Sequence, residues 1–305
     1  MVRNKVYFIW RDFVPHSPPF LAVALRSLAN IVTIPGYHRL IRLMFSPNRN
    51  TFPFDICQDG LRWIGNTKEY VFWHTYFLGS YENTLLHAMC KYVTMPQRGA
   101  LLDIGGNLGT TAVQCASSFQ YVHSFEPNHA LHESFCTLIQ ANDVTNVHLH
   151  PVALGDQDRM ATLTVFNAHN SGTGSLLNDD ILDEEHYTTV VEVRHAERYV
   201  EEHVNCSISA IKLDVQGYEA AILQSLANVI RRERPILYVE VTAPTTRAAV
   251  HPATFAERFG YSVRAYTTRR SRWFGRNQVI PIAEDQWAGF EGDALLVPTF
   301  HNAIA

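Results

Sequence analysis

The feature that most constrains the fold is an apolar run that ends in an acid and opens into a glycine-rich turn, residues 101–109 (LLDIGGNLG). A second apolar run follows and ends at Glu126, 17 positions after Gly109. This order predicts a strand–turn–helix–strand unit that binds a nucleoside, because glycine lets the backbone turn sharply and approach a ligand closely. An acid at the end of the second strand can accept hydrogen bonds from both ribose hydroxyls.

The turn indicates which nucleoside is bound. A dinucleotide fold uses G-x-G-x-x-G, because the pyrophosphate sits on the helix N-terminus. Here the pattern is D-x-G-x-N-x-G, with Asp103 at the strand end and Asn107 where a phosphate site prefers a small residue. The Asp103 carboxylate would repel pyrophosphate but attract a cationic ligand. S-adenosylmethionine carries a sulfonium and an ammonium and no phosphate, so it is the predicted cofactor. A nicotinamide- or flavin-dependent oxidoreductase is the disfavoured alternative.

Size and composition narrow the class of protein. The 305 residues suffice for one large domain with an appendage, and the net charge of −4 argues against a nucleic-acid-binding protein. The five cysteines include no CxxC pair, which favours free thiols in a reducing, cytoplasmic compartment and no zinc cluster. His148 and His150 lie on a predicted strand without further ligands, so we expect satisfied or exposed histidines and no metal site.

The N-terminal region lacks the alternation of strands and helices that follows. Residues 20–34 form an apolar stretch that is too short to span a bilayer, and we expect a helix there, started by Ser17-Pro18-Pro19. A small hairpin is expected around Asp59-Gly60. The helix either packs on the domain or forms half of an oligomer interface. Because Arg39 and Arg42 follow in a second amphipathic stretch, peripheral contact with a membrane surface is the alternative.

We interpret residues 1–80 as a mainly helical extension or lid on the substrate side, and residues 81–305 as the domain that binds S-adenosylmethionine. Aromatic residues before residue 80 either stack on a substrate or belong to the core, and the core is the favoured interpretation. They are Trp63, Tyr70, Phe72, Trp73, Tyr76 and Phe77.

From residue 100 the hydrophobic pattern predicts a regular α/β sheet. Strands are expected at 100–104, 121–125, 147–154, 208–214 and 236–241, with helices at 109–118, 129–141 and 217–232. Two inserted strands, 161–166 and 190–194, flank a loop at 167–186 that has the small polar composition of a mobile cover. Two antiparallel strands, 261–266 and 294–297, close the chain.

Four acids fall at the carboxyl ends of predicted parallel strands, where open α/β sheets bind ligands: Asp103, Glu126, Asp214 and Glu240. S-adenosylmethionine donates a methyl group, and a hydroxyl group that accepts it needs a general base to take its proton. Asp214 is the first candidate for this base, because its strand is expected beside the strand that ends at Asp103. Glu240 is the second candidate. Lys212 lies two positions from Asp214 and points to the same face of the sheet. It either holds Asp214 or a substrate oxygen, or forms a buried ion pair that only orders the strand.

The same residues carry a family resemblance. Residues 102–109 (LDIGGNLG) resemble the cofactor loop of class I methyltransferases, and Phe125-Glu126-Pro127 resembles their second acidic motif. Residues 211–219 (IKLDVQGYE) resemble the KxDxxGxE signature of the FkbM-type methyltransferases, and segments 79–82, 152–156 and 235–240 agree. The resemblance spans about residues 76–241, and Gly106 departs from the alanine that is usual in the family.

This resemblance implies a Rossmann-like, seven-stranded sheet with one reversed strand, flanked by helices. It also implies an S-adenosylmethionine-dependent O-methyltransferase that acts on a hydroxyl of a sugar, glycan, polyketide or peptide. An N-methyltransferase of a small molecule, or a protein that binds the cofactor without catalysis, stays an alternative. The implied cofactor site, with Glu82 at the methionine end, comprises Glu82, Asp103, Gly105, Gly106, Asn107, Gly109, Glu126, Pro127, Ala153 and Asp214.

Overall fold

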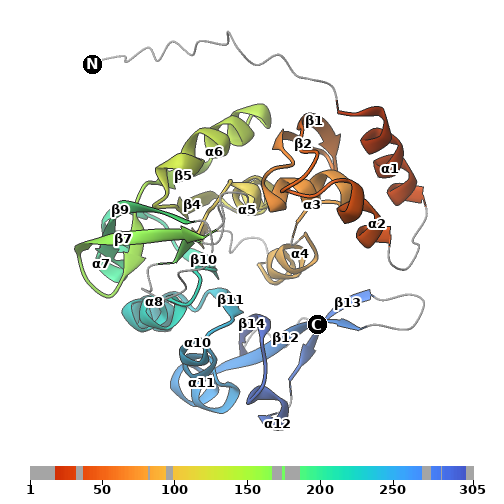
Figure 1. Cartoon of the computed structure of the whole chain (residues 1–305). Coiled ribbons are helices and arrows are strands. Elements are labelled where there is room, and N and C mark those ends of the chain that lie inside the picture. The colour runs from red at the N-terminus through yellow and green to blue at the C-terminus, as the bar shows by residue number, and fades with distance from the viewer. Residues whose placement is uncertain are drawn as a thin grey trace, which may run out of the picture.

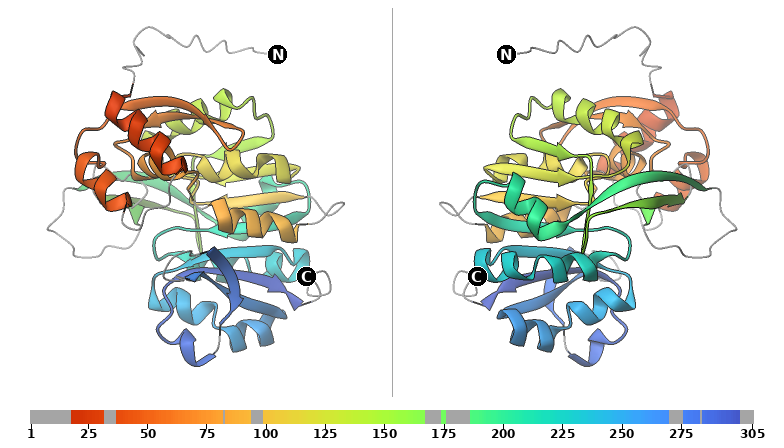
Figure 2. Two further views of the ribbon diagram at one scale, coloured as in Figure 1. Left: turned by 90° about the vertical axis from the view of Figure 1, so that its right-hand side faces the viewer. Right: turned by 90° about the vertical axis from the view of Figure 1, so that its left-hand side faces the viewer.

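The computed structural model describes residues 18–31, 37–81, 83–93, 99–166, 174–175, 186–269, 276–282 and 284–299. A large sheet forms the centre of the molecule, and helices lie on both of its faces (Figure 1). The N-terminal elements and the C-terminal elements lie at opposite ends, as the two side views in Figure 2 show in red and in blue.

Five parallel strands make up one half of the large sheet. In spatial order they are β5 (Val147–His150), β4 (Tyr121–Phe125), β3 (Ala100–Ile104), β10 (Ile208–Leu213) and β11 (Ile236–Val241). β3, β10 and β11 are almost entirely buried, as expected for a parallel sheet covered on both faces. Their apolar runs were therefore sufficient to predict them from the sequence.

The other half of the sheet contains the reversed strand. β14 (Gly292–Pro298) is antiparallel both to β11 and to β12 (Tyr261–Arg269), so it is the one reversed member of the seven predicted strands. The predicted seven-stranded sheet is thus confirmed. β13 (Arg276–Pro281) pairs with β12 as an eighth strand at the edge, which the sequence analysis did not predict.

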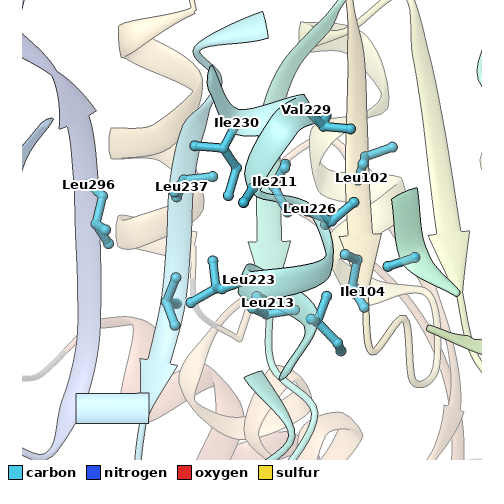
Figure 3. Close-up of a cluster of buried hydrophobic side chains, with 14 of the residues drawn as sticks. Leu102, Ile104, Ile211, Leu213, Leu223, Leu226, Val229, Ile230, Leu237 and Leu296 are labelled. Carbon is cyan, nitrogen blue, oxygen red and sulfur yellow. The ribbon is translucent and has the colours of Figure 1, made fainter. Parts of the chain in front are cut away.

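One face of the sheet is covered by α7 (Ala196–His203), α8 (Glu219–Ser225), α9 (Ala227–Glu233) and α11 (Pro252–Phe259). Figure 3 shows Leu223, Leu226 and Ile230 among the leucine and isoleucine side chains of β3, β10 and β11. The single helix predicted at 217–232 is two helices. Leu226 leaves helical geometry, with φ −90° and ψ 9°, while its side chain stays buried in the core.

The opposite face is covered by α4 (Asn83–Tyr92), α5 (Thr110–Cys115) and α6 (His129–Ala141), which contribute buried side chains such as Met89, Cys115 and Phe135. The short helices α10 (Pro244–Ala249) and α12 (Glu284–Trp287) lie in the C-terminal part.

A second, smaller sheet joins the large one through a strand that the sequence analysis treated as continuous. The strand predicted at 147–154 is two strands, β5 and β6 (Ala153–Gly155), because Pro151 between them cannot donate a ladder hydrogen bond. β6 pairs with β9 (His186–His195), and β9 pairs antiparallel with β7 (Arg159–Phe166). β7 and β9 contain the two inserted strands that were predicted at 161–166 and 190–194. Of the predicted cover loop 167–186, only β8 (Gly174–Ser175) and His186 lie within the described residues.

The N-terminal extension contains α1 (Phe20–Ile31), α2 (Tyr37–Met44), a hairpin of β1 (Pro53–Gln58) and β2 (Leu61–Asn66), and α3 (Tyr70–Leu78). Asp59 and Gly60 both have positive φ angles, the geometry expected for the predicted two-residue hairpin turn. Among the described helices, none combines the length and the apolar character needed to cross a membrane.

An aromatic cluster joins this extension to the rest of the molecule. The six aromatic residues predicted for the core are buried, apart from the partly buried Tyr70. They share one cluster with Leu108, Leu131 and Leu138, which follow β3 or belong to α6. The extension therefore packs directly on the unit that contains the glycine turn, beside α6 in Figure 1.

Candidate active site

A pocket opens at the carboxyl ends of β3, β4 and β10. Eight of the residues singled out in the sequence line it: Gly105, Gly106, Asn107, Glu126, Pro127, Ala153, Lys212 and Asp214. Asp103, Gly109 and Glu240 are not among the lining residues, and Glu82 lies outside the described residues. The fold thus brings most of the predicted positions together around one cavity.

The glycine turn is shaped by close backbone approach. The amides of Gly105 and Gly106 both donate to the carbonyl oxygen of Phe125 at 3.0 Å, which ties the turn to the end of β4. A Cβ on Gly105 would collide with the backbone oxygen of Asp214, and Gly105 also has φ +89°. A Cβ on Gly109 would lie 2.9 Å from the ring of Phe135, so Gly109 serves packing behind the pocket.

Glu126 is held by backbone amides. Its Oε2 accepts from the Asn107 amide at 2.9 Å, and its Oε1 accepts from the Asn128 amide at 2.7 Å. Burial raises the pKa of Glu126 to about 7, although these two hydrogen bonds act in the opposite direction. Each carboxylate oxygen has more than one acceptor site, so the carboxylate is oriented and retains capacity for ligand hydroxyls.

Asp103 is a buried acid behind the turn. The Ser124 hydroxyl donates to its Oδ2 at 2.7 Å, whereas Oδ1 has no hydrogen-bond partner among the described residues. Burial raises the pKa of Asp103, and the nearby Lys212 ammonium counteracts this effect. An unsatisfied buried carboxylate oxygen costs free energy, so a further donor at this position would stabilise the site.

Asp214 and Glu240 form the second acidic group of the site. Lys212 Nζ lies 3.2 Å from Asp214 Oδ2, with a lysine side chain that is only 4% exposed. The Gln216 side-chain amide donates to Asp214 Oδ1 at 3.2 Å and to Glu240 Oε2 at 3.1 Å. Lys212 and Asp214 thus lie on one face of the sheet, as their spacing indicated, and Gln216 links the two acids.

The two acids differ in charge. Burial, together with the charge of Asp214 and a hydrogen bond to it, raises the pKa of Glu240 to about 9. Burial also acts to raise the pKa of Asp214, but Lys212 and hydrogen bonds from Glu240, Lys212 and Gln216 hold it below its ordinary value. Within this pair Glu240 therefore binds a proton more tightly, and Asp214 ionises more readily.

Gln216, which the sequence analysis did not select, is placed by a strained loop. It has φ +56°, uncommon for a residue with a side chain. Glu219 fixes this loop: its Oε1 accepts from the amides of Val215 and Gly217 at 3.1 and 3.0 Å, and its Oε2 accepts from the Thr246 hydroxyl at 2.8 Å. The only signal for Gln216 in the sequence was its place between Asp214 and the glycine of the signature.

Several lining residues had no role assigned from the sequence. Val71 belongs to α3 of the N-terminal extension, Tyr81 to segment 79–82, and Tyr218 to the signature at 211–219. The Tyr218 hydroxyl donates to Asp156 Oδ1 at 2.9 Å. These residues line the pocket because of tertiary packing, which cannot be predicted from a local sequence pattern.

The histidines near the site are satisfied by one another and by aromatic rings. His123 Nδ1 and His150 Nε2 are 3.0 Å apart, and His150 stacks on Phe125. Burial, with neighbouring histidines adding to it, lowers the pKa of His123 and of His150 to about 4. In the part of the chain that the structure describes, no group of three His, Cys, Asp or Glu side chains is arranged to hold a metal ion.

Comparison with solved structures gives distant similarities. A methyltransferase FkbM from Methylobacillus flagellatus KT is 13% identical; the match covers 68% of this chain and 52% of that one, with a TM-score of 0.41. This chain thus spans about half the length of that protein. The O-methyltransferase TomG from Streptomyces achromogenes, solved with SAM, is 12% identical over 72% of this chain and 79% of its own, with a TM-score of 0.41. TYW2 from M. jannaschii, solved with AdoMet, is 10% identical over 81% and 86%, with a TM-score of 0.38.

The sequence itself gives the decisive comparison. No curated protein sequence matches the chain. The family model "Methyltransferase FkbM domain" matches residues 103–263, slightly more than half of the chain, from the acid of the glycine turn to β12. This range begins later than the resemblance noted in the sequence and reaches further, and it contains the glycine turn, Glu126, the signature around Asp214, and Glu240. The chain belongs to the FkbM methyltransferase family.

Proposed function

We propose that the protein transfers a methyl group from S-adenosylmethionine to a hydroxyl oxygen of a small molecule or glycan. The observation that carries this proposal is the carboxyl group of Asp214 in the wall of the pocket, which lies 3.2 Å from Lys212 Nζ, accepts a hydrogen bond from Gln216 and is linked through Gln216 to Glu240. A poised carboxylate is what a hydroxyl acceptor requires, since a neutral hydroxyl is a weak nucleophile until a base accepts its proton.

The residues of the pocket fit the cofactor that the sequence predicted. The carboxyl groups of Glu126 and Asp214 line the pocket and that of Asp103 lies behind it, while Lys212 is the one buried Lys or Arg side chain among the described residues, so the site favours a ligand with positive charge and no phosphate. Asp103 Oδ1 has no hydrogen-bond partner within the described part of the chain, and the Glu126 carboxyl group retains acceptor sites for ribose hydroxyls. When bound, S-adenosylmethionine supplies an electrophilic methyl group.

The protein side chains then have distinct tasks. Asp214 accepts a hydrogen bond from the acceptor hydroxyl, orients its oxygen, and takes its proton as the new bond to carbon forms. Glu240 donates to Asp214 and stays neutral, while Lys212 keeps Asp214 ionised before the reaction. Because a protonated ether is a strong acid, a carboxylate with a low pKa is a sufficient base for this step.

Residues 1–80 are proposed to form the substrate side of the pocket. Val71 of α3 reaches the lining, and Tyr81, just after this segment, is a further lining residue. These two side chains offer an apolar and an aromatic surface to the acceptor.

Calorimetric titration of S-adenosylmethionine, its demethylated product and NADH into the purified protein tests the proposal. We expect micromolar binding of the first two and none of NADH. A screen of sugar, polyketide and amine acceptors with labelled cofactor follows, and label incorporation into a hydroxyl is the expected result. Binding of NADH would overturn the cofactor assignment, label on nitrogen would overturn O-methylation, and cofactor binding without turnover on any acceptor would favour a non-catalytic protein.

A further inference from the structure

We propose that α1 and α2 form a docking surface for an anionic membrane, so that the protein binds peripherally to lipid through its N-terminal extension. The two helices lie at the outer side of the N-terminal part in both Figure 1 and Figure 2. The inference rests on three observations: the apolar side chains that these helices expose, the way they are oriented, and the charge of this part of the chain.

Both helices expose large apolar side chains. Phe20 is 89% exposed and Leu43 is 69% exposed, and Leu21, Val23, Leu28 and Leu40 are each more than two-fifths exposed. Six of the eleven exposed large hydrophobic side chains among the described residues thus belong to two short helices. Single exposed apolar residues are ordinary on a protein surface, whereas such a concentration marks an interaction site.

The orientation of the helices separates a core face from an outer face. Ala22 and Leu25 are buried in α1, and Phe20 and Val23 lie on the other side of the helix, while the exposed Leu21 and Leu28 flank Leu25. In α2, Ile41 is buried, while Leu40 and Leu43 are exposed. Phe20, Val23 and Leu43 therefore face away from the aromatic cluster, and Leu21, Leu28 and Leu40 extend the exposed apolar surface at its edges.

The charge of this region is opposite to that of the rest of the chain. Residues 1–49 contain seven Lys or Arg and a single acid, Asp12, whereas the chain as a whole has 25 basic and 29 acidic residues. Neither α1 nor α2 contains an acid, and Arg39 and Arg42 alternate with Leu40 and Leu43 on the exposed side of α2. Leucine or phenylalanine together with arginine is the composition of helices that lie in the plane of a membrane interface.

Charge also decides between a membrane and a second copy of the chain. A two-fold symmetric dimer through this face would bury the arginines of both protomers in one interface, where neither α1 nor α2 supplies an acid to pair with them, which is unfavourable. Anionic lipid headgroups instead attract each of these cations, and the acyl region accepts the apolar side chains. An anionic membrane is therefore the occupant that satisfies both features of the surface.

Docking would bring the pocket close to the membrane. α1 packs on α3, and α3 contributes Val71 to the pocket lining. The docking surface and the pocket are thus separated by a single layer of secondary structure. The arrangement suits an enzyme whose acceptor is presented at a lipid surface.

Vesicle flotation of the full chain tests the inference. The unmodified protein should float with vesicles of phosphatidylcholine and phosphatidylglycerol but stay in solution with phosphatidylcholine alone, and binding should weaken from about 0.1 M to about 0.5 M salt because exposed charges are screened. Leu40→Glu/Leu43→Glu should reduce the bound fraction at least tenfold. A matched control is Met160→Glu/Val190→Glu on β7 and β9, whose side chains are 64% and 63% exposed outside this surface.

The same variants exclude an effect of unfolding. Thermal unfolding midpoints of both double variants should equal that of the unmodified chain, because all four side chains are exposed. Equal flotation of the unmodified protein and Leu40→Glu/Leu43→Glu would overturn the inference, as would a protein that binds neither type of vesicle. A concentration-dependent dimer that Leu40→Glu/Leu43→Glu dissociates, without vesicle binding, would assign the surface to a second copy instead.

Discussion

The two acidic ends of the pocket are held in different ways. At the end of β4, Glu126 accepts hydrogen bonds from two backbone amides, those of Asn107 and Asn128. At the end of β10, Asp214 is held by side chains, those of Lys212 and Gln216, and is coupled to the side chain of Glu240. Backbone amides are fixed by the fold, whereas side-chain partners also set the charge of the group they hold.

This difference matches the two proposed roles, ribose binding for Glu126 and proton transfer for Asp214. A carboxylate fixed by backbone amides presents the same acceptor sites in every state of the reaction, which suits the recognition of ribose. A carboxylate within a network of titratable side chains has a pKa that its neighbours determine, which suits a group that must take a proton. Substitutions of Asp214, Lys212, Glu126 and Glu240 test this contrast.

Asp214→Asn should have the largest effect on turnover. Removal of a general base lowers the rate by about 10²–10⁴-fold, and methyl transfer to the acceptor found in the screen measures it. Glu240→Gln is the matched control, because burial raises the pKa of Glu240 to about 9 and glutamine mimics its neutral form at pH 7. If Glu240→Gln lost as much activity as Asp214→Asn, the assigned charges of the pair would be wrong.

Lys212→Met should destabilise the folded protein. The variant leaves Asp214 without its ion pair and removes the cation that counteracts the burial of Asp103, and breaking a buried pair costs about 3–5 kcal/mol. Urea unfolding measures the free energy of unfolding. Lys91→Met on the exposed side of α4 is the control and should change it by less than about 0.5 kcal/mol. Equal stability of the two variants would show that Lys212 does not balance the buried acids.

Glu126→Ala should weaken cofactor binding by about 1–3 kcal/mol, the cost of lost hydrogen bonds to ribose. Calorimetric titration of S-adenosylmethionine measures the change, and turnover at saturating cofactor should change much less than in Asp214→Asn. An unchanged affinity would remove Glu126 from the ribose site.

The stability of the folded protein should also depend on pH. The folded-state pKa of Glu240, about 9, exceeds its ordinary value of 4.5, so the folded state retains a proton that the unfolded state releases. The resulting stabilisation is complete below pH 4.5 and is lost as the pH rises towards 9. Glu240→Gln removes this contribution, so its free energy of unfolding should fall less between about pH 5 and about pH 9 than that of the unmodified chain. Parallel curves would contradict the raised pKa.

Local pattern was sufficient for most of the parallel sheet. β3, β4 and β11 begin and end where their apolar runs indicated, and α6 has its predicted bounds, because buried strands and amphipathic helices have distinct periods. The errors arose where tertiary packing overrides local preference. Leu226 lies between two helices with its side chain buried in the core. β13 pairs with β12 at the edge of the sheet.

In the candidate site, too, some residues were predictable from local pattern and others depended on tertiary structure. The sequence placed Glu126 and Asp214 at strand ends, because parallel strands expose their carboxyl ends along one edge of a sheet. It also indicated that Lys212 and Asp214 share a face, because alternate residues of a strand point in the same direction. Gln216 was missed because its role depends on a left-handed backbone conformation that Glu219 and Thr246 impose from a distance.

The sequence by itself therefore determined most strands of the large sheet, the glycine turn, the family and the acids at the strand ends, since each of these shows in a local motif or in a fixed hydrophobic period. Only the tertiary structure decided which acid carries the proton, since the pKa values of Asp214 and Glu240 follow from burial and from neighbours on other strands. It also decided that Val71 reaches the pocket and that α1 and α2 keep an apolar face uncovered. The burial of a side chain depends on contacts between elements that are far apart in the sequence, so it cannot be predicted from one segment alone.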